Sequence, residues 1–139
     1  MKFILFVIIL TSLCIGESEK ISDITVIDGD TIELEDRQRV RLIGIDSTEF
    51  GQRCHREGKE KLKELVEEKE IKLISDRQDK DKYGRLLRYV YIDELSINLE
   101  MVMSGNAYAI KMEPNTRYYE ELSHAQSEAI KEKRGCLWE

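Results

Sequence analysis

The run Val26-Ile27-Asp28-Gly29-Asp30-Thr31 decides how the chain folds, because it joins two short stretches rich in residues that favour strands. These stretches, 24–27 and 31–34, are too short to form helices. An Asp-Gly pair between two such stretches predicts a hairpin, since glycine reaches positive φ without steric cost. The hairpin would place Asp28 and Asp30 at the mouth of a sheet.

A second run, Arg41-Leu42-Ile43-Gly44-Ile45-Asp46-Ser47-Thr48-Glu49, adds an arginine and two acids. Residues 39–45 are predicted as a third strand, which would deliver Asp46 and Glu49 beside the hairpin. Strict alternation would put Arg41 and Asp46 on opposite faces, so a bulge or close backbone approach at the glycine must re-aim one of them. Carboxylates that converge from strand ends suit a hard cation with oxygen ligands, and an arginine among them suits a phosphate.

The remainder of the chain contains two more strand patterns and three helix patterns, separated by polar turns. Apolar residues at helical spacing identify the helices, and glycines mark their ends. The predicted strands are 71–75 and 86–92; the predicted helices are 52–69, 97–104 ending at Gly105, and one capped by Asn115 or Thr116 that runs to about Lys133 and ends at Gly135. Residues 136–138 then form an apolar clasp. The pattern alone predicts a small α+β domain.

The composition is that of one acidic domain. The 139 residues are enough for a single hydrophobic core, and one proline without a long Gly/Ser tract leaves no predicted linker. Charged residues make up 36% of the chain, and the net charge is −6. Nonspecific affinity for nucleic acid comes from Lys and Arg, so this balance argues against a general nucleic-acid binder. Attraction for such a substrate would have to come from a local basic site and a bound cation.

The first 16 residues have the pattern of a signal peptide. A lysine precedes an almost unbroken apolar run, 3–10, and a small-residue exit ends at Gly16. The run is short for a bilayer span, which takes about 20 apolar residues. We therefore predict cleavage after Gly16, a secreted or cell-envelope location, and a single domain over residues 17–139. The alternatives are an uncleaved anchor, which would keep the chain at a membrane, and a lipid-modified Cys14.

Export would leave Cys54 and Cys136 as an even pair in an oxidising compartment, so a disulfide between them is predicted. It would tie the start of the first helix to the C-terminal tail, and a loop of this length is worth about 4 kcal/mol in the chain-entropy treatment. Two free buried thiols are the alternative. Structural zinc is not expected, because two cysteines and two distant histidines lack the required spacing.

The two runs described above and a third, Asp81-Lys82-Tyr83-Gly84-Arg85, together resemble the staphylococcal nuclease (thermonuclease) family. The resemblance covers Ile24 to Trp138, with the three motifs in the family's order and spacing. It implies an α+β fold in which a five-stranded OB-fold β-barrel carries three α-helices. The order of the predicted elements, with the first helix between the third and fourth strands, agrees with that fold.

The resemblance also implies a Ca²⁺ site. In the family pattern Ca²⁺ would be bound by Asp30, Asp46 and the main-chain carbonyl of Ser47, with Asp28 nearby. An isolated Asp-Gly-Asp would be only a turn former. The arginines and the glutamate at matching offsets favour the metal site instead.

The same family pattern assigns the catalytic and substrate-binding positions. Arg41 and Arg85 match two arginines that stabilise the charge of the phosphoryl transition state. Glu49 matches a proposed general base, and whether it takes the proton or mainly orients the water stays open. The substrate-binding candidates are Lys82 for a phosphate, and Tyr83, Tyr108 and Tyr118 for base stacking.

The sequence departs from the family pattern beside Glu49, where Ser47-Thr48 stands in place of a common Thr-Pro. Ser47 keeps a hydroxyl and a carbonyl, so metal ligation should survive. Loss of the proline is expected to loosen the loop that sets Glu49.

These implications describe an exported, Ca²⁺-dependent endonuclease that cleaves DNA and RNA as a monomer and leaves 3′-phosphate ends. The alternative is a catalytically inactive OB-fold module that binds single-stranded nucleic acid or a protein partner. A degenerate module is expected to have lost a member of the set that is complete here: Asp30, Arg41, Asp46, Glu49 and Arg85. The preference between DNA and RNA stays open.

Overall fold

A computed structural model describes residues 20–139. The segment predicted to be a signal peptide, residues 1–16, lies outside these described residues. Within the described part of the chain, no helix is both long and apolar enough to cross a membrane.

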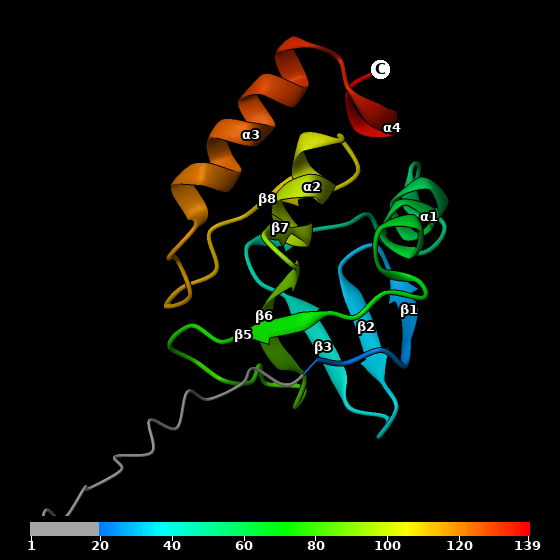
Figure 1. The fold of residues 1–139 in the computed structure, drawn as a ribbon. Helices are drawn as coiled ribbons and strands as arrows, with labels where there is room; N and C mark the ends of the chain where they lie inside the picture. The colour runs from blue at the N-terminus through cyan, green and yellow to red at the C-terminus, as the bar shows by residue number, and fades with distance from the viewer. Residues whose placement is uncertain (1–19) are drawn as a thin grey trace, which may run out of the picture.

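The centre of the fold is a strongly bent sheet. Its strands are β1 (Ile24–Asp28), β2 (Thr31–Leu34), β3 (Arg39–Leu42), β5 (Lys72–Ile74), β6 (Leu86–Ile92) and β7 (Leu95–Ser96). Successive antiparallel pairings join β1 to β2 and β2 to β3, and β3 then pairs in parallel with β6. Strand β6 also pairs with β5 and β7, so the path through the sheet is β1-β2-β3-β6-β5 (Figure 1).

Two backbone hydrogen bonds bring the ends of this path together. The N–H of Ile21 donates to Ile71 O at 3.0 Å, and the N–H of Ile71 donates to Ile21 O at 2.8 Å. These residues precede β1 and β5, so the first and last strands of the path meet. Five strands in this order form the predicted OB-fold barrel.

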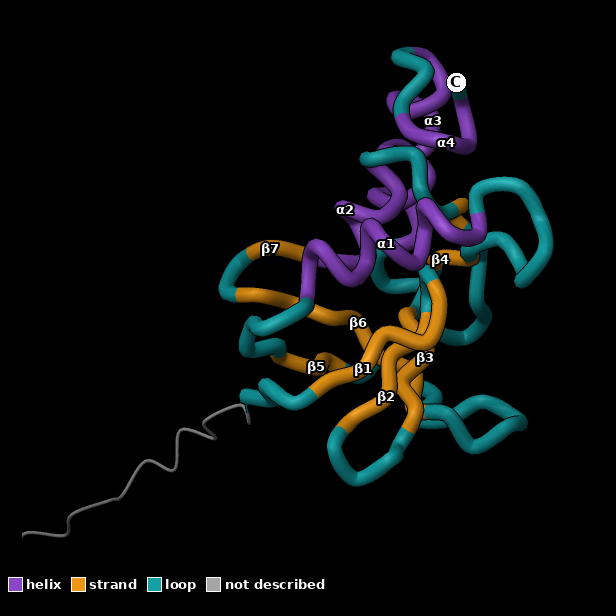
Figure 2. The backbone as a smooth tube through the Cα atoms, turned by 90° about the vertical axis from the view of Figure 1, so that its right-hand side faces the viewer, coloured by secondary structure: helices purple, strands orange, loops and turns teal. Residues whose placement is uncertain are grey.

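The helices gather at one end of the barrel, which Figure 2 shows clearly. They are α1 (His55–Val66), α2 (Ile97–Met103), α3 (Tyr119–Lys131) and α4 (Gly135–Trp138). Apolar side chains of α1 and α2 pack onto the barrel interior in one cluster that includes Leu62, Val66, Met101, Val102, Ile32, Val40 and Leu42. The first three helices confirm the predicted ones, whereas α4 was predicted only as an apolar clasp.

The hairpin forms as predicted, but its glycine is not needed for a positive φ. Gly29 is not among the glycines with positive φ. A Cβ at this position would instead lie 2.7 Å from the Cβ of Ser47 and 3.1 Å from the backbone of Gly58. Glycine is therefore required because two other segments pack against the turn.

The break predicted at the glycine of the third strand is also present. Strand β3 ends at Leu42, Gly44 adopts φ +78°, and a separate short strand, β4 (Ile45–Asp46), follows. Strand β4 leaves the barrel sheet and pairs with β8 (Tyr108–Ala109). This change of direction brings Asp46 to the side of the sheet where Arg41 lies.

The ends of the last helix differ from the prediction. Helix α3 begins at Tyr119, and neither Asn115 nor Thr116 caps it, because Tyr118 occupies the N-cap position. Its C-terminal end lies at Lys131, and Lys133 adopts the left-handed conformation with φ +51°. Gly135 does not end this helix but opens α4.

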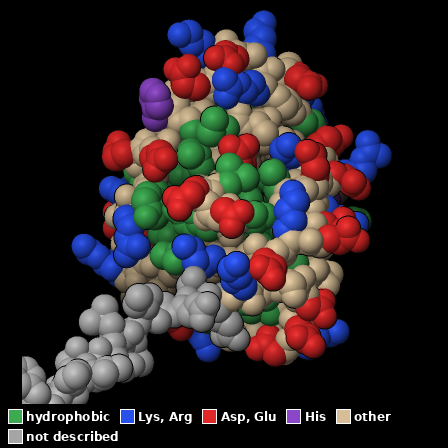
Figure 3. All heavy atoms as spheres, in the orientation of Figure 1, with side chains coloured by type: hydrophobic (Ala, Val, Ile, Leu, Met, Phe, Trp, Pro, Cys, Tyr) green, Lys and Arg blue, Asp and Glu red, His purple; other side chains and the backbone are tan. Residues whose placement is uncertain are grey.

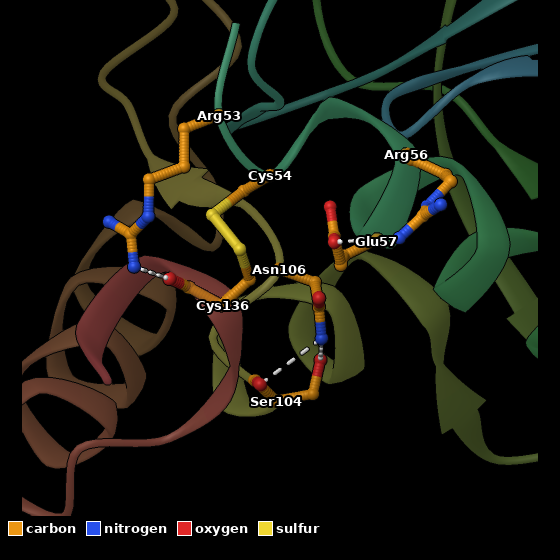
Figure 4. Close-up of a disulfide and its surroundings, with 7 residues drawn as sticks. All are labelled: Arg53, Cys54, Arg56, Glu57, Ser104, Asn106 and Cys136. Atoms are coloured by element: carbon orange, nitrogen blue, oxygen red, sulfur yellow. Dashed lines mark hydrogen bonds and ion pairs between the residues drawn. A yellow bond between two sulfur atoms is a disulfide. The ribbon is translucent and has the colours of Figure 1, made fainter.

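The C-terminal clasp is a covalent and closely packed junction. The structure contains the predicted disulfide, with the Cα atoms of Cys54 and Cys136 5.6 Å apart (Figure 4). Arg53 Nη2 donates to the carbonyl of Cys136 at 2.7 Å. A Cβ at Gly105 would lie 1.8 Å from the carbonyl oxygen of Arg134, so the loop after α2 touches the tail directly.

Candidate active site

Arg41 lies at the centre of the candidate site, and its guanidinium is almost fully buried. Its Nη1 donates to the carbonyls of Leu42 and Ile45, both at 2.7 Å. Its Nη2 donates to Asp46 Oδ1 at 3.1 Å and lies 3.4 Å from Asp30 Oδ2. Carbonyls from the end of β3 and from β4 thus orient the guanidinium between two carboxylates, one from the β1–β2 turn and one from β4.

Asp30 is fixed by the segment that follows β4. Its Oδ2 accepts hydrogen bonds from the backbone N–H of Ser47 at 2.9 Å and from Ser47 Oγ at 3.1 Å, and its Oδ1 accepts one from Thr31 Oγ1. Burial alone would raise the pKa of Asp30, but the charge of Arg41 and these hydrogen bonds outweigh it and hold the pKa below its ordinary value. Asp30 is therefore an ionised, buried carboxylate.

The two neighbouring acids respond in the opposite direction. Burial raises the pKa of Asp28 to about 6, and the hydrogen bond and negative charge of Asp30 add to the rise. Partial burial also raises the pKa of Asp46, against the attraction of Arg41, and the charges of Asp30 and Glu49 contribute. Asp30 and Asp46 thus share one guanidinium, and Asp28 lies beside Asp30, which leaves an excess of negative charge.

The donor set fits a hard cation. A divalent ion would neutralise the excess charge of these carboxylates, and carboxylate and carbonyl oxygens are the ligands that Ca²⁺ prefers. Asp30, Asp46 and the carbonyl of Ser47 would bind it. Among residues 20–139, no three Asp, Glu, His or Cys side chains are arranged as a complete metal cage. Carbonyl and water oxygens would therefore complete the coordination, as Ca²⁺ sites allow.

The second predicted arginine approaches from the loop between β5 and β6. Arg85 Nε donates to Asp81 Oδ2 at 2.7 Å, and its guanidinium lies 5.4 Å from the centre of the Tyr83 ring. Lys82 Nζ lies 5.1 Å from the centre of the same ring. An open cavity of about 370 Å³ is lined by Arg41 as well as by these loop residues. The structure therefore brings both predicted arginines to one cavity.

Glu49 lies on an exposed loop that is tied at its ends. Gln52 Oε1 accepts a hydrogen bond from the backbone N–H of Glu49 at 3.0 Å, and His55 Nδ1 lies 2.9 Å from the carbonyl oxygen of Thr48. The charge of Glu49 contributes to the raised pKa of Asp46, so the two carboxylates are electrostatic neighbours. The loop that lacks the family's proline is held by side-chain contacts instead.

The chain aligns with known nucleases over most of its length. Residues 39–139 match the family described as "Staphylococcal nuclease homologue". The chain is 34% identical over 124 residues to the thermonuclease of Staphylococcus hyicus, covering 83% of this chain and 73% of the relative. It is 36% identical over 123 residues to the thermonuclease of Staphylococcus intermedius, covering 82% and 73%. An uncharacterized endonuclease of Haemophilus influenzae is 33% identical over 132 residues, covering 91% and 73%.

This chain belongs to the staphylococcal nuclease family. The family pattern predicted three tyrosines as base-stacking candidates, and their surroundings in the structure differ. Tyr83 lines the cavity and is 72% exposed. Tyr108 lies opposite Asp46 in the β4–β8 pairing, and its ring meets Trp138 edge-on with centroids 5.6 Å apart. Tyr118 packs edge-on against buried Tyr89, with centroids 4.7 Å apart, so its ring has a packing role.

Sequence reasoning missed Asn115 as a positioning residue of this staphylococcal nuclease fold. Its side chain is buried; Oδ1 accepts from the backbone N–H groups of Arg77 and Gln78 at 3.0 and 2.8 Å, and Nδ2 donates to Gln78 O at 3.0 Å. In Figure 1 the loop after β5 and the loop before α3 lie side by side, as these bonds require. The Pro-Asn pair signalled a turn, but not a contact with a loop 37 residues earlier.

The surface charge agrees with a local site. On the face in Figure 3, basic and acidic side chains are interspersed around a central group of apolar ones. No extended basic area is visible on the described part of that face. The cavity itself is lined by Arg41, Arg85 and Lys82, three cations that can attract a polyanion locally.

Proposed function

We propose that this chain is an exported endonuclease that uses Ca²⁺ to hydrolyse phosphodiester bonds in DNA and RNA. Family membership and the names of its relatives, thermonuclease and endonuclease, support the nuclease activity. The family resemblance implies release of the 5′-oxygen and 3′-phosphate ends. The pattern of residues 1–16 supports export to the cell envelope or the medium.

The observation that carries the proposal is the shared position of Arg41 and Arg85. Both line the cavity of about 370 Å³, and Arg41 also contacts Asp30 and Asp46. Cleavage of a phosphodiester builds negative charge on the equatorial oxygens of phosphorus, where positioned guanidiniums are most effective. Their planar forks match two phosphate oxygens and stay charged at all physiological pH values.

Glu49 is the proposed general base. Its carboxylate is exposed to solvent and neighbours Asp46, so it can accept a proton from a water that attacks phosphorus. A Ca²⁺ ion bound by Asp30, Asp46 and the carbonyl of Ser47 would supply positive charge to the phosphoryl group. Lys82 and Tyr83, which also line the cavity, would bind the substrate strand.

Digestion of denatured DNA and of RNA, with Ca²⁺ and then with excess chelator, tests the proposal. We expect cleavage with Ca²⁺ only, fragments that a polymerase extends only after phosphatase treatment, and an intact mass of the exported protein that lacks residues 1–16. Cleavage that resists the chelator would contradict the metal assignment. Binding without cleavage under every condition would support the inactive OB-fold module.

The Glu49→Gln variant tests the role of the base within the same assay. Turnover should fall by a factor on the order of 100 or more, as expected when a general base is lost, while the circular dichroism spectrum stays unchanged. Glu60→Gln is a matched control, because Glu60 is an exposed glutamate on the outer face of α1. A Glu49→Gln protein as active as the Glu60→Gln control would remove Glu49 from the mechanism.

A further inference from the structure

Four large apolar side chains stand out as exposed in the described part of the chain: Phe50, Tyr83, Leu95 and Ile130. The two aromatic ones border the candidate site. Tyr83 lines the cavity beside Arg85, and Phe50 follows Glu49 directly in the chain. Phe50 is 90% exposed, the highest fraction of the four.

Phe50 is held in its exposed position by a constrained loop. Its ring meets the ring of His55 edge-on, with centroids 5.6 Å apart, and His55 Nδ1 is bonded to the carbonyl of Thr48. The disulfide at Cys54 anchors the end of the same loop. The exposure of the ring is therefore a feature of the folded loop, although burial in the core would have been more favourable.

We propose that Phe50 forms a second nucleotide subsite, at which a base of single-stranded nucleic acid stacks on the exposed ring. The proposal rests on the proposed function and specifies the substrate form of the same site. Tyr83 lines the cavity together with Arg41, and Phe50 follows Glu49 in the loop after Asp46, the carboxylate that pairs with Arg41. The two rings would offer separate stacking platforms to bases of the same strand.

The subsite should favour single strands without reading sequence. Every base has a π face, so an aromatic platform accepts all four bases. Bases inside a duplex are already stacked and paired, and they reach such a platform only after the duplex opens. Arg53, an exposed cation three residues after Phe50, adds positive charge for the backbone of the strand.

The test compares Phe50→Ala and Phe50→Tyr with the control Leu95→Ala. Binding is followed by fluorescence anisotropy of labelled single-stranded and duplex oligonucleotides in a Glu49→Gln background, in which the strands stay intact. We expect Phe50→Ala to weaken single-strand binding at least about fivefold, the lower end of the effect of losing one stacked base. Phe50→Tyr should restore binding, and duplex binding should not change.

Leu95 is the matched control, because it is exposed and lies on β7, far along the chain from the site. Leu95→Ala should leave single-strand binding unchanged, and all three variants should keep the melting temperature of the parent. Equal weakening by Phe50→Ala and Leu95→Ala, or no weakening by Phe50→Ala, would overturn the subsite. If single-strand binding depends on Phe50 but the wild-type protein cleaves no nucleic acid, the proposed function is overturned and the subsite is retained.

Discussion

The two arginines of the candidate site are held in opposite ways. Arg41 is part of barrel strand β3; its side chain is 9% exposed and contacts two carbonyls and two carboxylates. Arg85 belongs to the loop before β6; its side chain is 29% exposed, and among residues 20–139 Asp81 is the carboxylate with which it forms an ion pair. The barrel supplies a buried, preorganised guanidinium, and the loop supplies a more exposed one with fewer partners.

The difference between the two arginines indicates which part of the site is fixed by the fold. If Arg41 were replaced by a neutral residue, Asp30 would stay buried but would lose its main counter-charge. The loop with Arg85 is instead attached to the body through Asn115, whose side chain bonds to Arg77 and Gln78. Activity can therefore be lost on either side, but stability should depend mainly on the barrel side.

The largest effects are expected from Arg41→Gln and Arg85→Gln, which should both lose activity but differ in stability. Both should lower kcat by a factor on the order of 100 to 1,000, as loss of a transition-state contact does. Only Arg41→Gln should also lower the free energy of unfolding, by about 3 kcal/mol, because it leaves Asp30 without its cation. Urea unfolding and steady-state kinetics on both variants measure the two quantities. Equal stability losses would refute the contrast between barrel and loop.

A second prediction concerns how much the disulfide between Cys54 and Cys136 contributes to the stability of the fold. The disulfide joins residues 82 positions apart, so its reduction should lower the free energy of unfolding by about 4 kcal/mol in the chain-entropy treatment. Urea unfolding with and without dithiothreitol measures the loss. The double variant Cys54→Ser, Cys136→Ser serves as control, since it should be less stable from the start and insensitive to the reductant. If the urea unfolding curve of the wild-type protein is the same with and without dithiothreitol, the disulfide does not contribute to stability.

The smallest effect concerns the tether of Arg85, which is its ion pair with Asp81. Burial would raise the pKa of Asp81, but hydrogen bonds from Arg85 and from the backbone N–H of Tyr83 outweigh it and hold the pKa below its ordinary value. The tether thus persists across the neutral range and weakens only in acid. Asp81→Asn should lower kcat about tenfold and change stability by less than about 1 kcal/mol.

Asp79→Asn is the matched control for this variant. Asp79 lies on the same loop and pairs with Arg88, so its loss removes an ion pair without touching Arg85. The control should keep the parental kcat. If Asp79→Asn and Asp81→Asn reduce kcat equally, loop charge in general, and not the tether of Arg85, sets the rate.

Local patterns in the sequence were sufficient to predict most of the elements. The hairpin at Asp28 to Thr31, the strand at 86–92 and the short helix at 97–103 lie where alternation and helical spacing predicted them. Such patterns depend on near neighbours, which the sequence displays directly. The reason for Gly29 was mistaken, because a close approach to Ser47 and Gly58 is invisible to local rules.

The sequence by itself determined the residue types and spacing of the site, from Asp30 and Arg41 to Glu49 and Arg85, and with them the family. Only the tertiary structure decided how Arg41 is buried between two acids, how Asn115 attaches the Arg85 loop, and how Phe50 comes to lie exposed beside the site. The physical reason is that these features depend on contacts between segments far apart in the chain. Their burial and charge balance exist only after the barrel has closed.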